Sequence, residues 1–179
     1  MTYKVIQWAT GGVGRAAVSY IAAHPELELV GCWVSSAEKE GQDVGELCGL
    51  PALGGMATRD ADALVDMDAD CVMYSPVMAD RGLVARLLAS GKNVVTPLGW
   101  FYPGDRDVSD LEAACLQGGT TLHGTGIHPG GITERFPLMV SALSAGITHV
   151  RAEEFSDIRT YNAPAVVSDI MLFGKTPEE

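Results

Sequence analysis

Residues 3–25, YKVIQWATGGVGRAAVSYIAAHP, decide the fold, because an apolar run leads into three glycines and then into a helical pattern. The apolar run is rich in β-branched and aromatic side chains, which is typical of a buried strand. After the glycines, apolar residues recur at helical spacing until Pro25 ends the pattern. The stretch therefore predicts a strand, a glycine-rich turn and a helix, and the turn is either a phosphate cradle or an ordinary tight turn.

Strand and helix patterns continue to alternate through the first part of the chain. Further strands are predicted at 27–34, 70–76, 93–98 and 120–126, and further helices at 79–91 and 106–119. Continuous apolar strands separated by helices indicate a parallel sheet that is covered on both faces. Residues 1–131 are therefore predicted to form one α/β domain, a doubly wound parallel sheet of the Rossmann type.

The pattern changes after Gly131. Residues 132–146 predict one more helix, with Thr133 as its N-cap, and residues 149–161 predict a strand with one solvated face. A single strand cannot form a stable sheet, so its partner strands come either from another subunit or from a longer protein. We favour the second interpretation and expect residues 132–179 to be the incomplete start of an α+β domain.

Composition and charge exclude several classes of function. The net charge is −11 with only 12 lysines and arginines, which argues against a nucleic-acid partner. No apolar stretch is long enough to cross a bilayer and no signal peptide precedes the first strand, so we expect a cytoplasmic protein without a membrane partner. The four cysteines form no CxxC pair and the histidines no HxxxH pair, so no metal site is expected.

The glycine-rich turn has the spacing Gly11-x-x-Gly14-x-x-Ala17. Glycines let the backbone approach a pyrophosphate, and the following helix presents free N–H groups and its positive dipole end to the anion. The position of the turn on the first strand and first helix favours a dinucleotide over a plain turn. The predicted cradle consists of Gly11, Gly12, Val13, Gly14 and Arg15, with the arginine adding a charge-assisted contact.

The end of the second strand bears on which dinucleotide is bound. An Asp or Glu there would hold the free hydroxyls of the adenosine ribose. This chain has Ser35, Ser36 and then Lys39 instead, which suits a 2′-phosphate, although Glu38 and Glu40 flank the lysine. We therefore favour NADP(H) as the cofactor and keep NAD(H) as the alternative.

Three later strands end in loops that contain Gly, Pro and hydroxyl side chains: YSP (74–76), TPLGW (96–100) and GTGIHPGG (124–131). Ligands of an open parallel sheet lie beyond the carboxyl ends of its strands, so these loops are expected to line the nicotinamide end of the site. His128 or Tyr102 is predicted to deliver a proton there, and a plain hydrogen-bonding role for His128 is the alternative.

Four stretches, VIQWATGGVGRAAV, VSSAEKEGQDVGEL, TPLGW and GTGIHPGGITERFPLMVSALS, together resemble the dihydrodipicolinate reductase-like oxidoreductases. The resemblance covers essentially the whole chain and is closest to the branch of 2,4-diaminopentanoate dehydrogenase and the native amine dehydrogenases. It implies NAD(P) dependence, an N-terminal Rossmann domain, and a C-terminal α+β domain that closes the substrate site and forms a homodimer or higher oligomer. Chains of this family are considerably longer, which agrees with an incomplete second domain.

The resemblance also implies roles for individual residues. Ser35, Ser36 and Lys39 would face the adenosine ribose, Ser75, Pro76, Thr96 and Pro97 would approach the nicotinamide ribose, and His128 would lie near the nicotinamide ring. One departure concerns the substrate. Amine dehydrogenases of this branch carry an acid in the loop after the fifth strand, whereas this loop, TPLGWFYPGD, has none before Asp105.

The sequence therefore predicts an NAD(P)H-dependent oxidoreductase that transfers hydride to or from a small carbonyl or imine/amine substrate. The alternative is a catalytically silent dinucleotide-binding module that acts in sensing or assembly. The missing acid and the incomplete second domain are the two features that favour this alternative.

Overall fold

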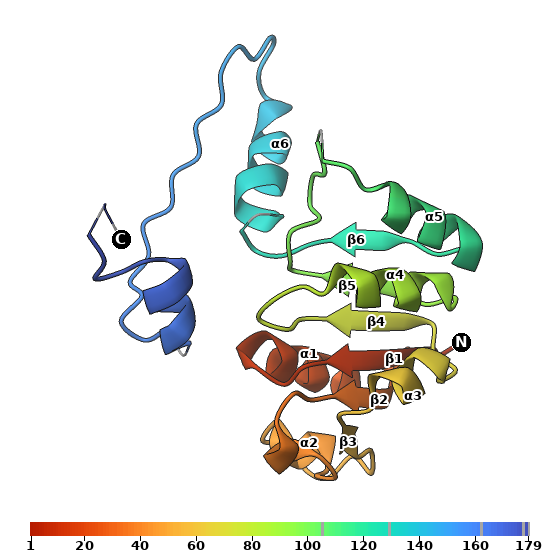
Figure 1. The fold of residues 1–179 in the computed structure, drawn as a ribbon. Helices are drawn as coiled ribbons and strands as arrows, with labels where there is room; N and C mark the ends of the chain where they lie inside the picture. The colour runs from red at the N-terminus through yellow and green to blue at the C-terminus, as the bar shows by residue number, and fades with distance from the viewer. Residues whose placement is uncertain (105, 129, 162, 177, 179) are drawn as a thin grey trace. The chain divides into compact units, whose positions relative to one another are not determined.

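The computed structural model describes residues 1–104, 106–128, 130–161, 163–176 and 178 (Figure 1). Its contacts divide the chain into two units, Met1–Ser144 and Ala145–Glu179, and each unit is described by itself. The first unit contains the sheet and every residue of the predicted site. Asp105 lies outside the described residues.

A six-stranded parallel sheet forms the centre of the first unit. Its strands are β1 (Tyr3–Trp8), β2 (Leu27–Trp33), β3 (Ala57–Thr58), β4 (Cys71–Tyr74), β5 (Asn93–Thr96) and β6 (Leu122–Gly124). They lie in the order β3-β2-β1-β4-β5-β6, and each neighbouring pair is parallel. This arrangement confirms the predicted doubly wound sheet. Strand β3 was not predicted, because two residues are too few to show a period.

Helices connect the strands. They are α1 (Gly12–Ala23), the 3₁₀ turn η1 (Ala37–Lys39), α2 (Val44–Leu47), α3 (Ala61–Asp66), α4 (Arg81–Ala89) and α5 (Ser109–Gly118). Alternate residues of a strand point to opposite faces of a sheet. Val5, Met73 and Val95 accordingly line the α1 face, whereas Ile6, Val72 and Val94 belong to the core under α3, α4 and α5.

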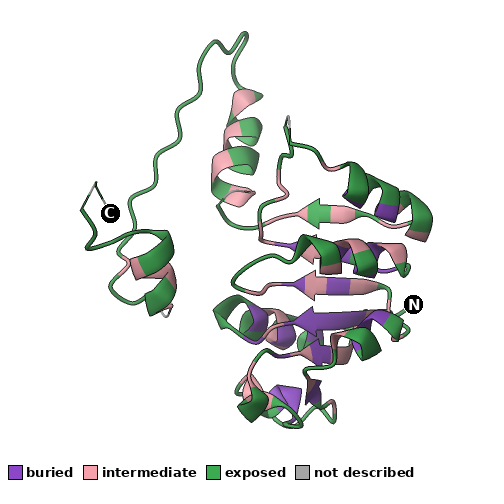
Figure 2. Cartoon of the chain, in the orientation of Figure 1, coloured by how far each residue is buried: buried purple, intermediate pink, exposed green. Residues whose placement is uncertain are grey.

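The main core lies between the sheet and helices α3, α4 and α5. Ile6, Val72, Leu87 and Val94 are completely buried in it. Figure 2 shows that buried residues are concentrated in the central strands. Burial of each such aliphatic side chain contributes about 1.5–3 kcal/mol, so this layer holds the strand ends at fixed positions.

The segment after β6 differs from the prediction. The predicted helix is present, but it begins as a π turn, η2 (Gly131–Arg135), which continues into α6 (Phe136–Ser141). Thr133 therefore lies inside the helix and is not its N-cap. The predicted strand over 149–161 was wrong, because no residue of that range is in a strand. An extended segment becomes a strand only through ladder hydrogen bonds to a partner strand.

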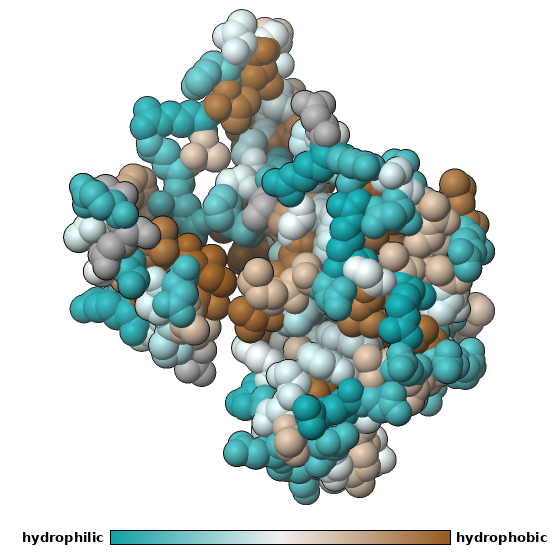
Figure 3. Space-filling view, in the orientation of Figure 1, coloured by the Kyte–Doolittle hydropathy of each residue, from teal (hydrophilic) through white to brown (hydrophobic). Residues whose placement is uncertain are grey.

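Among its described residues, the second unit has one named element, the short π turn η3 (Val166–Ile170). Ile170, Met171, Leu172 and Phe173 at its end are exposed apolar residues, and apolar side chains are visible at the surface of this unit in Figure 3. The wider prediction that residues 132–179 begin a second domain stays a prediction. Residues 162, 177 and 179 of that segment lie outside the described residues.

Candidate functional site

The carboxyl ends of the parallel strands meet at one edge of the sheet. At that edge the strand order reverses, because β2 lies on one side of β1 and β4 on the other. Ligands of open α/β sheets bind at such a switch point. The loops that follow β1, β2, β4, β5 and β6 therefore form the candidate site, together with the first turn of α1 and the last residue of β5. These parts contain all the site residues that the sequence predicts.

The glycine-rich turn joins β1 to α1 at the switch point. Gly11 precedes the helix, and a Cβ atom placed on Gly11 or Gly12 would meet nothing within 4 Å. Val13 and Arg15 are exposed in the first helical turn. The N–H groups of a first turn have no partner within the helix. The turn thus presents open space, unpaired donors and one cation, which fit a pyrophosphate.

Gly14 has a different structural role from Gly11 and Gly12. It is buried, and a Cβ atom at this position would lie 2.0 Å from the carbonyl oxygen of Ala9. Ala9 itself has a left-handed backbone with φ of 75°, and its N–H donates to the carbonyl oxygen of Trp33 at 2.9 Å. Close backbone packing between β1 and α1 therefore sets the direction in which the glycine-rich turn leaves the sheet.

Gln7 is a site residue that sequence reasoning missed. Its side chain is completely buried, and its Nε2 donates to the Ala9 carbonyl at 2.8 Å and to the Ser75 hydroxyl at 2.9 Å. The amide thereby links the glycine-rich turn after β1 to the loop after β4. The available signal was a long polar residue inside an apolar strand, since buried polar groups require hydrogen-bond partners.

The predicted adenosine end lies in the loop after β2. Ser35 is exposed, and the Ser36 hydroxyl accepts a hydrogen bond from the N–H of Glu38 at 3.3 Å. Lys39 extends back to the glycine-rich turn, where its Nζ donates to Thr10 Oγ1 at 3.1 Å. The structure therefore brings Lys39 together with the predicted pyrophosphate cradle, which lies 24 or more positions earlier in the sequence.

A cavity of about 470 Å³ opens beside the ends of β1, β2 and β4, and it includes Pro76. Trp8 and Trp33 stack in its wall with ring centroids 5.3 Å apart. Tyr74 also lines it, and its hydroxyl accepts a hydrogen bond from the N–H of Asp80 at 2.9 Å. Burial raises the pKa of this phenol, so Tyr74 stays neutral in the physiological range.

Thr96 is the last residue of β5, and Pro97 and Tyr102 lie in the loop that follows it. Thr96 is completely buried, and its Oγ1 accepts a hydrogen bond from the N–H of Leu98 at 3.0 Å, so this hydroxyl shapes the loop. Pro97 lines a second cavity of about 410 Å³, together with Trp100 and Arg106. Tyr102 is 83% exposed on the same loop.

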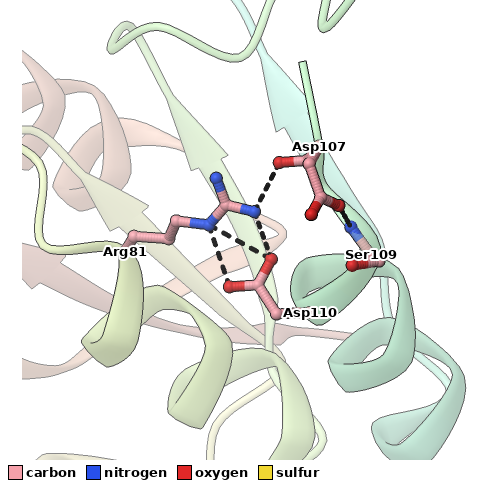
Figure 4. Close-up of polar contacts among 4 residues, drawn as sticks. All are labelled: Arg81, Asp107, Ser109 and Asp110. Atoms are coloured by element: carbon pink, nitrogen blue, oxygen red, sulfur yellow. Dashed lines mark hydrogen bonds and ion pairs between the residues drawn. The ribbon is translucent and has the colours of Figure 1, made fainter. Parts of the chain in front are cut away.

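An ion pair fixes the two helices that border this second cavity (Figure 4). Arg81, the first residue of α4, donates from Nε to both carboxylate oxygens of Asp110 in α5, at 2.8 and 3.1 Å. It also donates from Nη2 to the carbonyl oxygen of Asp107 at 2.6 Å. The guanidinium lowers the pKa of Asp110 to about 2. Arg81 thereby links the start of α4 to the start of α5.

His128 lies in the loop after β6 and is exposed. Its Nδ1 is 3.3 Å from Thr133 Oγ1, which in turn donates to the Glu134 carboxylate at 2.6 Å. The same carboxylate accepts a hydrogen bond from the N–H of Gly130. The Thr133 hydroxyl and this N–H, with a smaller effect of the nearby His128, lower the pKa of Glu134. Sequence reasoning missed Glu134, because it looked for an acid only after β5.

Neither a metal site nor a membrane-spanning helix is found in the part of the chain that the structure describes. No group of three or more His, Cys, Asp or Glu residues there could hold a metal ion. Among the same residues, no helix has the length and apolar character that a membrane span requires.

Comparison with known proteins identifies a relative that aligns with nearly the whole chain. An amine dehydrogenase of Streptomyces virginiae is 33% identical over 183 residues, which cover 96% of this chain and 51% of that protein. The chain is therefore similar to this amine dehydrogenase over nearly the whole of its own length. It spans about half the length of this relative. No family model matches the chain.

A second relative, from Synechococcus elongatus, is a 4-hydroxy-tetrahydrodipicolinate reductase. It is 39% identical over 61 residues, which cover 34% of this chain and 22% of that reductase. The two relatives confirm the resemblance to the dihydrodipicolinate reductase-like oxidoreductases and to their amine dehydrogenase branch.

Solved structures share the fold. An amine dehydrogenase from Mycobacterium smegmatis superposes with a TM-score of 0.65 at 23% identity, over 72% of this chain and 40% of that one. GenD2 from gentamicin A biosynthesis, in complex with NAD, has a TM-score of 0.55 at 21% identity. The match covers 74% of this chain and 35% of GenD2. Biliverdin reductase from Synechocystis, in complex with biliverdin and NADP+, has a TM-score of 0.53 at 18% identity. The match covers 70% of this chain and 38% of that reductase.

Proposed function

We propose that this chain carries the cofactor-binding part of an NAD(P)H-dependent oxidoreductase that acts on a small carbonyl or imine/amine substrate. The observation that carries the proposal is the open glycine-rich turn at the switch point of the sheet, with Arg15 and Lys39 beside it. The names of the relatives support it, since a dehydrogenase and a reductase both transfer reducing equivalents. The bound nicotinamide would supply the hydride chemistry.

The cradle residues would hold the pyrophosphate. Gly11, Gly12 and Val13 would approach it with backbone N–H groups, and Arg15 would add a guanidinium contact. Gly14 would act indirectly, since its lack of a side chain lets α1 approach the Ala9 carbonyl. These assignments require a ligand with two neighbouring phosphates.

NADP(H) is the cofactor we favour, with NAD(H) as the alternative. Lys39 is held beside the glycine-rich turn by its contact with Thr10, which places an ammonium group near the expected adenosine ribose. Ser35 and Ser36 would add hydroxyl groups for a 2′-phosphate. Enzymes that prefer NAD use a carboxylate at the end of β2, and this strand ends at Trp33 with no acid before Glu38.

The nicotinamide half would lie over the loops after β4, β5 and β6. Ser75, Pro76, Thr96 and Pro97 would shape the pocket for its ribose. His128 is the proposed proton donor and Tyr102 the second candidate. The contact of His128 with Thr133, and of Thr133 with Glu134, supports His128, because these contacts orient the imidazole in the loop after β6.

The substrate is proposed to be a small molecule that contains a C=O or C=N group or the corresponding amine. Trp100 and Phe101 would give its pocket an apolar wall. We further propose that the protein is cytoplasmic and forms a homodimer or higher oligomer through its C-terminal segment, because the family that it resembles does so. Neither a nucleic acid nor a membrane is among the proposed partners.

Cofactor titration tests the proposal. Tryptophan fluorescence, which reports on Trp8, Trp33 and Trp100, should be quenched by NADPH or NADH. No response to either would refute both the oxidoreductase and the silent binding module. NADPH oxidation should then be followed with a panel of ketones, with and without ammonia. The Streptomyces virginiae amine dehydrogenase serves as the positive control. Because the second domain is expected to close the substrate site, binding without turnover would favour the silent module only in a protein that contains that domain in full.

A further inference from the structure

The buried amide of Gln7 has only one orientation that satisfies its surroundings. Its nitrogen faces two carbonyl oxygens, that of Ala9 at 2.8 Å and that of Trp8 at 3.2 Å. Carbonyl oxygens only accept hydrogen bonds, so the nitrogen and not the oxygen of the amide must face them. The side-chain oxygen of Gln7 is buried and has no partner among the described residues. The two backbone carbonyls therefore determine how the amide is turned.

This orientation fixes the hydrogen bonding of Ser75. The amide nitrogen carries two hydrogens, and its two shortest contacts, to Ala9 and to Ser75 Oγ at 2.9 Å, use both. Ser75 must accept from Gln7, so its own proton is available for the carbonyl oxygen of Trp8 at 3.2 Å. A hydroxyl has one proton and two lone pairs. One lone pair of Ser75 remains, and it can only accept.

We propose that Gln7 is a positioning residue that makes the Ser75 hydroxyl a hydrogen-bond acceptor toward the ligand. The ligand group bound there is then a neutral donor, either a ribose hydroxyl or a carboxamide N–H₂. A phosphate or carboxylate is unsuited to this position, because it would place acceptor against acceptor. The inference rests on the proposed function, since it assigns Ser75 to the nicotinamide half of a dinucleotide.

A double-mutant cycle separates this role from a general structural one. Gln7→Met removes the amide while keeping a side chain of similar length, and Ser75→Ala removes the hydroxyl. Each should weaken binding of NADP+ about three- to tenfold, the usual effect of one hydrogen bond. Because Gln7 acts through Ser75, the double variant should bind NADP+ with the same affinity as the single variant that has the lower affinity.

Ligand fragments locate the effect. Adenosine 2′,5′-bisphosphate lacks the nicotinamide half, so its affinity should be the same in the wild type and in Ser75→Ala. The 3-acetylpyridine analogue of NADP+ lacks the carboxamide N–H₂. If the carboxamide is the donor, Ser75→Ala should not change the affinity for this analogue, and if a ribose hydroxyl is the donor, the loss should match that for NADP+.

Calorimetric titration gives each affinity, and thermal melting shows whether each variant is folded. Gln117→Met, on the exposed face of α5, is the matched control and should change no affinity. Additive losses, or an equal loss of bisphosphate affinity in Ser75→Ala, would overturn the inference but leave the proposed function intact. Unchanged NADP+ binding by Ser75→Ala would overturn it even if Gln7→Met does not fold. If the wild type binds NAD+ more tightly than NADP+, the same measurements use NAD+, AMP and the 3-acetylpyridine analogue of NAD+. If it binds no dinucleotide, the proposed function itself is refuted.

Discussion

The carbonyl oxygen of Ala9 occupies the space that a side chain at Gly14 would need, since a Cβ atom there would lie 2.0 Å from it. Gly14→Ala should therefore force the first turn of α1 away from β1. Overpacking of this kind costs about 1–3 kcal/mol in the free energy of unfolding, which urea denaturation would measure. Gly12→Ala is the control, because its Cβ atom would meet nothing within 4 Å, and its stability should stay within about 0.5 kcal/mol of the wild type.

Lys39 should discriminate between the two cofactors. Lys39→Ala removes the ammonium group that Thr10 holds beside the glycine-rich turn. A lost charge-assisted contact to a 2′-phosphate should weaken NADPH binding about tenfold or more, whereas NADH binding should change less than about twofold. Fluorescence titration would measure both dissociation constants. Lys175→Ala makes the same change in net charge in the second unit, and an equal loss in that variant would argue against a specific contact.

Asp43 should make stability depend on pH. Its carboxylate accepts hydrogen bonds from the backbone N–H groups of Gly45, Glu46, Leu53 and Gly54. These bonds, the one from Leu53 most of all, lower the pKa of Asp43 in the folded state. A lowered folded pKa means that the stabilisation is complete above the unfolded value of about 3.9 and is lost as the pH falls below it.

Asp43→Asn tests this dependence. The amide keeps one acceptor oxygen but turns an N–H₂ group toward a backbone donor, so the variant should melt at a lower temperature than the wild type at pH 7. The difference should shrink as the pH falls below about 3.9, because the carboxylate of the unfolded wild type then takes up a proton and the stabilisation by the folded carboxylate is lost. Asp60→Asn is the control, because among the described residues the Asp60 carboxylate accepts a single backbone hydrogen bond, from the N–H of Ala63. A difference that is independent of pH would contradict the charge-based explanation.

The ion pair of Arg81 and Asp110 gives a second pH test at the other end of the candidate site. Arg81 holds the pKa of Asp110 at about 2, below its unfolded value of about 3.9. The contribution to stability is therefore present above about pH 4 and disappears as the pH falls toward 2. Arg81→Met should lower the melting temperature at pH 7 and have little effect near pH 2.

The effect of this pair should be small, because both side chains are about half exposed and solvent screens them. Arg151→Met is its control, since Arg151 forms an ion pair with Glu153, two positions away, in the second unit. That variant should not change the melting of the sheet. If both variants lower the melting temperature equally, the link between α4 and α5 has no special role.

The sheet and the glycine-rich turn were predictable because their signals are local. The apolar run of residues 3–8, the three glycines and the helical spacing after them lie within one stretch of chain, and each signal follows from the geometry of the element itself. The same reasoning failed at 149–161, where alternation indicated a strand. A strand also needs a partner, and the alternation of one segment carries no information about whether a partner is present.

Contacts between distant residues depended on the tertiary structure. Gln7 meets Ser75, which is 68 positions away, only because β1 and β4 pair in a register that sets Trp8 opposite Tyr74. Lys39 reaches Thr10 because the chain after β2 returns to the end of β1. Sequence by itself determined that a doubly wound parallel sheet was present and which loops follow the carboxyl ends of its strands. The packing of one strand against another decided which side chains meet in those loops, since hydrogen bonds form only between groups that register brings within about 3 Å.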